Sequence, residues 1–223
     1  MLKKAALILV FLLPLFSAFG QRKLPRWHEP TKAETELAEY NAQCVHRNKY
    51  SAAQRLRFYP FNKAVQVKLV AFYGLSDPNV QVFVDSVAQK APKKINYWKY
   101  PFNGNETDTT QFIEVKLLNK VQVNKLTDIL YNIDQRAIDY NIIYNQYACY
   151  EPRNAIVFTN SKGKIFAHIE ICFECRKIST RPEKMNIGGY CEGKLDLLKS
   201  YFASSGIIYG VDTAYTYKFK RIR

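Results

Sequence analysis

The architecture of this protein can be inferred outward from residues 155–171, which read AIVFTNSKGKIFAHIEI. Two runs rich in β-branched and aromatic residues flank the polar segment 160–163, so the stretch predicts a β-hairpin with a turn at Asn-Ser-Lys-Gly. If Thr159 pairs with Lys164, alternation gives the hairpin one apolar face that belongs in the core. That face consists of Ile156, Phe158, Ile165, Ala167, Ile169 and Ile171.

Apolar periodicity on both sides of the hairpin predicts the remaining elements. Helices are expected over residues 31–55, where Thr31 and Glu34 form a capping box, over 78–90, around Leu126–Ile133, and over Leu195–Phe202 with Gly206 as its end. Strands are expected over 63–73, with one solvated face, over 112–118 and over 138–147, and the end of the chain, 207–222, looks extended. The polar segment 100–110 reads as a loop.

This order of elements predicts an α+β fold, because helices and strands do not alternate strictly enough for a doubly wound sheet. We expect a mixed or mainly antiparallel sheet of about five strands with helices packed on one face and the hairpin 155–171 at its centre. The expected organisation is a signal peptide over 1–20, a polar leader and N-terminal helix over 21–55, and a single α+β domain over 56–223.

The first twenty residues predict export. Lys3 and Lys4 precede an apolar run over 5–16, and small residues at Ala18 and Gly20 follow, which is the order of a secretory signal peptide cut after Gly20. The alternative is a membrane anchor, but a run of about a dozen residues interrupted by Pro14 is short of the roughly 20 that span a bilayer. No later stretch has that length, so we expect a secreted or periplasmic protein without a transmembrane span.

The chain is strongly basic. Removing Lys3 and Lys4 with the signal peptide lowers the formal net charge from +14 to +12. There is no run of five or six like charges, so we favour charges scattered over a solvated surface and see no specific nucleic-acid signal. The alternative is a weak attraction to anionic components of the cell envelope. The sequence names no other partner.

Three of the five cysteines lie next to the hairpin. The proposed register puts Cys149 opposite Glu174, between Cys172 and Cys175, and puts Arg153 opposite Glu170, where the two can form an ion pair. Cys191 follows fifteen residues after Cys175 and could reach the third cysteine.

These cysteines allow three kinds of chemistry. In an exported protein we favour disulfides, with Cys149 bonded across the hairpin and Cys191 closing a second bridge. The first alternative is a zinc site built from Cys149, Cys172, Cys175 and Cys191, which has one C-x-x-C and lacks a second closely spaced pair. The other is a thiol redox pair at Cys172 and Cys175. Cys44 reads as a small buried residue on the first helix, with cross-linking as its alternative.

Nothing in the sequence identifies a catalytic site. His168 and Cys172 share a strand face, but four residues of about 3.3 Å each separate them by roughly 13 Å, too far for a cysteine–histidine pair. We expect His168 to be a half-exposed strand residue. The sequence has no G-x-S-x-G, P-loop, Rossmann or H-E-x-x-H motif, and its acidic residues form no obvious catalytic pair. We therefore favour a non-catalytic binding or structural domain that needs no cofactor, and keep the zinc or redox protein as the alternative.

The segments CYEPRNAI (149–156) and IEICFEC (169–175) resemble the C-Y-x-P-R-x-x-[IL]... I-C-F-E-C core of an uncharacterised family of exported bacterial proteins. Leu130-Tyr131-Asn132 and Asp196-Leu197-Leu198-Lys199 are similar to the Bacteroidota-like members. The resemblance covers roughly Leu126 to Gly210 and leaves out the N-terminal third. Because the family has no assigned activity, it implies a cysteine arrangement and a bacterial origin, and no reaction.

Overall fold

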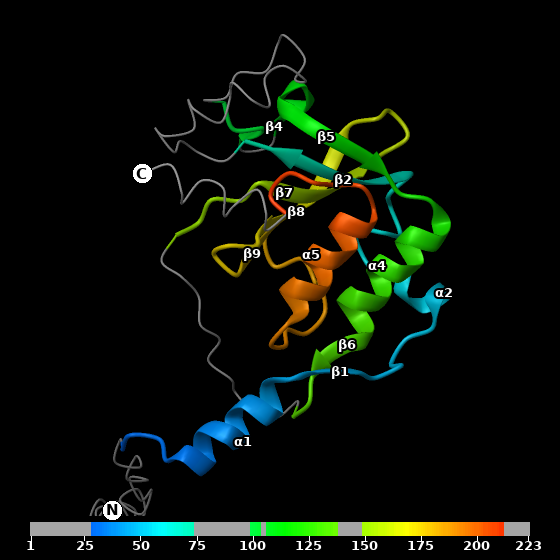
Figure 1. Ribbon diagram of the computed structural model, residues 1–223. Coiled ribbons are helices and arrows are strands. Elements are labelled where there is room, and N and C mark those ends of the chain that lie inside the picture. The colour runs from blue at the N-terminus through cyan, green and yellow to red at the C-terminus, as the bar shows by residue number, and fades with distance from the viewer. Residues whose placement is uncertain (1–27, 74–98, 104–105, 138–148, 212–223) are drawn as a thin grey trace, which may run out of the picture. The chain divides into compact units, whose positions relative to one another are not determined.

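An antiparallel sheet of five strands lies at the centre of the structure (Figure 1). The computed structural model describes residues 28–73, 99–103, 106–137 and 149–211. The strand order is β5 (Phe112–Leu117), β2 (Gln66–Phe72), β7 (Asn154–Thr159), β8 (Ile165–Cys172) and β9 (Lys177–Arg181). With four α-helices among the described residues, this confirms the predicted α+β fold and its mainly antiparallel sheet.

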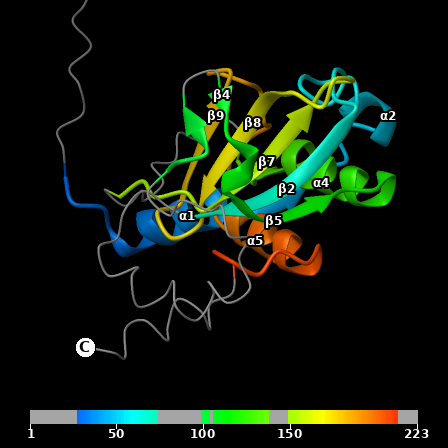
Figure 2. The same ribbon diagram turned by 90° about the horizontal axis from the view of Figure 1, so that it is seen from above.

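The predicted hairpin is formed by β7 and β8, which run side by side with β2 in Figure 2. Its register differs from the predicted one by two residues, so that Ile156 pairs with Ile169. A shift of two residues leaves each side chain on its predicted face. The exceptions are Ile165 and Phe166, which exchange faces, so that Phe166 packs against the core face. A bulge between Phe158 and Thr159 pairs Thr159 with Ile165, and Ile165 therefore packs against the opposite face of the sheet.

Two helices cover the face that carries Ile156 and Phe158. They are α4 (Lys120–Asn132) and α5 (Lys194–Ser204), whose apolar positions Leu126, Leu130, Leu195, Leu198 and Phe202 join the sheet in the larger core cluster, as predicted. Gly206, with φ of +93°, follows the C-cap Ser205 and ends α5.

The other face of the sheet carries a second apolar cluster. It consists of Val70, Phe72, Phe102, Phe112, Ala155 and Val157. Strand β2 therefore has a solvated face only near its start, where Gln66 is exposed, and the prediction of one solvated face was wrong for its second half. The predicted loop 100–110 contains β3 (Phe102–Asn103), β4 (Glu106–Thr107) and the 3₁₀ turn η2 (Thr109–Gln111). Phe102 is buried because it belongs to this cluster.

The chain divides into two units, Met1–Thr35 and Glu36–Arg223. In the first, Thr31 and Glu34 form the predicted capping box, with the Glu34 carboxylate accepting the Thr31 N–H at 2.8 Å and the Thr31 hydroxyl accepting the Glu34 N–H at 3.3 Å. The helix that they start, α1 (Lys32–Ala42), ends well before the predicted residue 55.

Beyond Ala42 the chain forms β1 (Cys44–His46), which pairs with β6 (Ile133–Gln135). A second capping box, at Ser51 and Gln54, then starts the short helix α2 (Ala52–Arg55). Pairing with a distant strand thus replaces the helix that local periodicity predicted.

Several predictions fall on residues outside the described ranges: the signal peptide, the helix over 78–90 and the whole of the strand over 138–147. The predicted domain boundaries also remain predictions. Of the extended end, residues 209–211 form a turn and not a strand. Within the described ranges, every helix is too short or too polar to cross a bilayer.

Candidate functional site

The three cysteines near the hairpin meet where β8 turns into β9. Cys172 ends β8 and pairs with Lys177, so residues 173–176 form the turn between the two strands. Cys149 forms a disulfide with Cys175 across this turn, with a Cα–Cα distance of 5.6 Å. The expectation that Cys149 lies beside Cys172 or Cys175 in a disulfide is confirmed.

The second disulfide joins Cys44 to Cys191, with a Cα–Cα distance of 5.0 Å. Cys191 therefore does not bond to the third cysteine of the hairpin, and Cys44 is not a core residue of a helix but the first residue of β1. A backbone hydrogen bond from the Glu192 N–H to the Ala42 carbonyl, 2.7 Å long, holds the same two segments together. Because these distant segments pair, Cys44 lies in a strand and not in the helix that its spacing predicted.

Cys172 is a free, buried thiol. Its Sγ accepts the N–H of Cys175 at 3.2 Å and donates to the Glu151 carbonyl at 3.4 Å. Burial raises the pKa of the thiol, which disfavours the reactive thiolate. The C-x-x-C motif therefore holds one bonded and one protonated sulfur, on a strand turn and not at a helix N-terminus.

The four-thiolate zinc site is not formed, because disulfides use the sulfurs of Cys149, Cys175 and Cys191. Nor do the described residues contain any other group of three or more His, Cys, Asp or Glu side chains that could hold a metal ion.

The predicted ion pair between Arg153 and Glu170 does not form. Arg153 instead contacts Glu174 at 3.1 Å and Glu151 at 3.6 Å. The physical reason is the shifted register, which places Glu170 opposite Ala155. Arg153 thus lies over the disulfide turn, and Glu170 is free to bind other groups.

Glu170 accepts hydrogen bonds from three side chains on the sheet face opposite the helices. The donors are His168 Nε2 at 2.9 Å, the Tyr100 hydroxyl at 2.5 Å and the Tyr150 hydroxyl at 3.1 Å. Burial by itself would raise the pKa of the Glu170 carboxyl, but the hydrogen bonds from His168 and Tyr100 outweigh it and hold the pKa below its ordinary value. The carboxylate is therefore ionised, and hydrogen bonds from protein side chains stabilise its charge.

His168 is held between this carboxylate and an aromatic ring. Its imidazole stacks on Phe102 with ring centroids 4.1 Å apart and an interplanar angle of 22°. Only 5% of the residue is exposed, so the expectation of a half-exposed histidine was wrong. Phe102 comes from the segment that read as a loop, and its contribution to the sheet face was not visible in the sequence.

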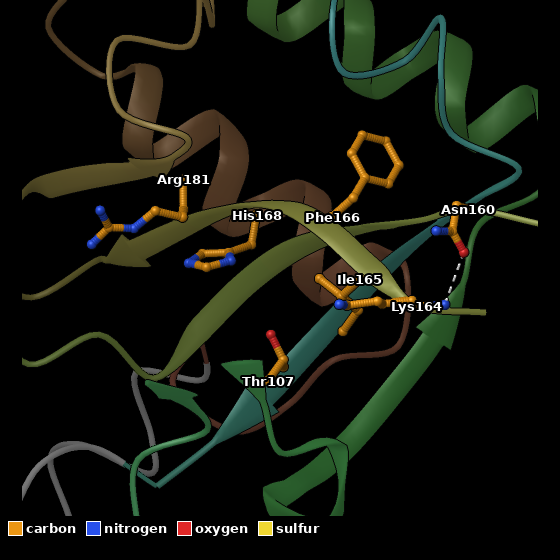
Figure 3. A pocket seen from close by; sticks show the side chains of 7 residues that line it. All are labelled: Thr107, Asn160, Lys164, Ile165, Phe166, His168 and Arg181. Carbon is orange, nitrogen blue, oxygen red and sulfur yellow. Dashed lines mark hydrogen bonds between the residues drawn. The ribbon is translucent and has the colours of Figure 1, made fainter. Parts of the chain in front are cut away.

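A pocket of about 400 Å³ opens beside His168 (Figure 3). Strand β8 and the turn before it line the pocket with Asn160, Lys164, Ile165, Phe166 and His168. Thr107 of β4 and Arg181 of β9 complete the lining. Figure 3 shows the Arg181 and His168 side chains next to one another, as expected from their pairing across β8 and β9.

Arg181 was missed as a site residue because β9 was not predicted, whereas Lys164 lies on the predicted hairpin but was not recognised there as part of a pocket. Arg181 was visible only as one of several scattered surface charges. The alternation of Ile178 and Thr180 with polar residues was a weak strand signal that could have placed Arg181 beside β8. The pocket itself forms only when β4, β8 and β9 come together.

Comparisons with models of known protein families, with curated proteins and with solved structures found no match for this chain. Fold class and disulfides therefore come from the structure alone, and the family resemblance of the cysteine core remains a prediction.

Proposed function

We propose that the protein is exported and acts as a non-catalytic binding domain. The observation that carries this proposal is the use of four of its five cysteines in two disulfides. Disulfides persist in oxidising compartments outside the cytoplasm. The signal-peptide pattern of residues 1–20, a prediction from the sequence, points to the same compartment.

Binding is favoured over a purely structural role by the pocket beside His168. Most of its lining comes from β8 and β9, two paired strands of the central sheet. Ligand sites are usually preformed concave surfaces in which a few polar groups are held in place. A His168 ring fixed by Glu170 and Phe102 meets that description.

A second candidate is a thiol–disulfide exchange protein, which one observation favours. The free thiol of Cys172 lies three residues before the bonded Cys175 and accepts its N–H. Burial and the raised pKa of Cys172 weigh against this role, because exchange requires an accessible thiolate.

The proposal is tested by intact-mass measurement of protein recovered from an exporting host. Alkylation under denaturing conditions should label one cysteine without reductant and five after reduction, and the mature chain should begin near Gln21. A Cys172→Ser variant serves as the matched control and should show no label without reductant. Three or more free thiols in the exported protein, or retention of the whole chain in the cytoplasm, would overturn the proposal.

A further inference from the structure

We propose that the pocket beside His168 binds a small organic anion through a carboxylate or phosphate group. This inference rests on the proposed function, a binding domain, and names the class of its ligand. Ile165 and His168 of the lining pack with the Phe102 cluster, on the sheet face opposite α4 and α5.

The charge of the lining selects an anion. Lys164 and Arg181 are cationic, and none of the seven lining residues is acidic. Among the residues that the structure describes, no buried acidic side chain pairs with either cation. Arg181 forms an ion pair with Glu183 at 3.2 Å, and half of the arginine side chain and 78% of the glutamate side chain are exposed. Exposed pairs of this kind contribute little free energy, so a bound anion can take the place of Glu183.

The acid behind the pocket does not oppose this assignment. Glu170 faces three donors, and each of them compensates part of its charge. Its contact with His168 Nε2 also fixes the orientation of the imidazole, which is further held by the stack on Phe102. The position of the His168 ring is therefore set before a ligand binds, and binding need not immobilise this side chain.

The turn before β8 fixes the position of Lys164. The side-chain oxygen of Asn160 accepts the backbone N–H groups of Lys162 and Lys164, both at 3.0 Å, and the second of these bonds is drawn in Figure 3. The amide oxygen is thus occupied, while within the described ranges no side chain pairs with the ammonium of Lys164, which can therefore contact a ligand. Both cations suit an oxyanion, and the guanidinium of Arg181 can bind two of its oxygens at once.

The remaining lining sets the size and character of the ligand. Ile165 supplies apolar surface and Thr107 a hydroxyl group. A volume of about 400 Å³ is near the lower end for small-molecule sites, which favours a compact ligand with an anionic head and a short apolar body.

The test uses the full chain with its disulfides intact and three probes of similar shape: benzoate, phenyl phosphate and neutral benzamide. Binding is followed by NMR titration of the backbone amides. Saturable shifts at residues 160–168 and 181 are expected with at least one of the anions, and the tighter of the two identifies the head group. Benzamide should bind at least about tenfold more weakly, since a charge-assisted hydrogen bond contributes this much or more.

Variants separate the pocket from general basicity. Lys164→Gln and Arg181→Gln should each weaken anion binding about tenfold, whereas Lys162→Gln, two residues from Lys164 on the same turn and outside the pocket, should leave it unchanged. The inference is overturned if no probe gives saturable shifts there or if Lys162→Gln weakens binding as much as Lys164→Gln. It is also overturned if benzamide binds as well as the anions, although this last result still supports a binding domain. The mass experiment tests export and the disulfides independently of all three outcomes.

Discussion

The ammonium of Lys194 donates a hydrogen bond of 2.7 Å to the carbonyl of Leu130, 64 positions earlier in the chain. The same Nζ donates to the carbonyls of Ile133, at 2.9 Å, and Gly189. Lys194 begins α5, while Leu130 lies in the last turn of α4, whose final carbonyls have no partner within their own helix. A cation also suits the negative end of the helix dipole. Lys194 thus caps α4 from a neighbouring helix.

Replacing Lys194 by Met should lower the free energy of unfolding by about 2 kcal/mol, because methionine keeps the apolar stem but leaves buried carbonyls without a donor. Burial lowers the pKa of Lys194 to about 8, so the capping charge is present at neutral pH. Chemical denaturation measures the loss. Lys120→Met, at the exposed start of α4, is the control and should change little. An equal effect of the two substitutions would contradict the capping role.

The two disulfides should differ in their contribution to stability. The Cys44–Cys191 bridge closes a sequence separation of 147 residues and the Cys149–Cys175 bridge one of 26. In the chain-entropy model, removing the disulfide that closes the longer loop lowers the free energy of unfolding by about 5 kcal/mol, and removing the one that closes the shorter loop lowers it by about 3.5 kcal/mol. Denaturation of the two paired Cys→Ala variants gives these values. A larger loss for the Cys149–Cys175 pair would contradict the entropic ordering.

Stability should fall at acid pH through Glu170. Burial raises the pKa of this carboxyl, but the hydrogen bonds of His168 and Tyr100 more than compensate, so the folded-state pKa lies below the ordinary value of 4.5. The stabilisation is therefore complete above about pH 4.5 and is lost as the pH falls through the lower, folded-state pKa. The pH dependence of the free energy of unfolding should be flatter below pH 4.5 in Glu170→Gln. An unchanged slope would show that Glu170 is not a source of the acid sensitivity.

Cys172 should be unreactive in the folded protein. The residue is 2% exposed and its pKa is raised by burial, so a thiol-specific disulfide reagent should modify it only on unfolding. The measurement compares the rate of modification in buffer with the rate in guanidinium chloride. Cys172→Ala gives the background. Rapid modification of the native protein would instead support the thiol–disulfide exchange role.

The hairpin shows which structural features the sequence can predict and which it cannot. Alternation placed Ile156 and Ile169 correctly on the core face, because a strand has only two faces and a two-residue error in register preserves them. The same pattern could not reveal the bulge at Thr159, which moves Ile165 to the other face. It also could not predict that Arg153 would pair with Glu174, since that choice depends on register.

The parts that escaped prediction depend on contacts between distant segments. The early end of α1 was not predicted. The chain after it is held by the pairing of β1 with β6 and by the Cys44–Cys191 disulfide, and no local sequence pattern signals either contact. The cysteines near the hairpin could be placed because they are close in sequence as well as in space. The candidate pocket could not, because Arg181 reaches it only through the pairing of β9 with β8.

All five strands of the central sheet lie in the chain between Cys44 and Cys191. The disulfide therefore closes the whole sheet into one covalent ring. A single protease cut anywhere within that ring leaves both pieces attached, and they separate only after reduction. In an oxidising compartment, where disulfides persist, one cleaved peptide bond need not divide the chain.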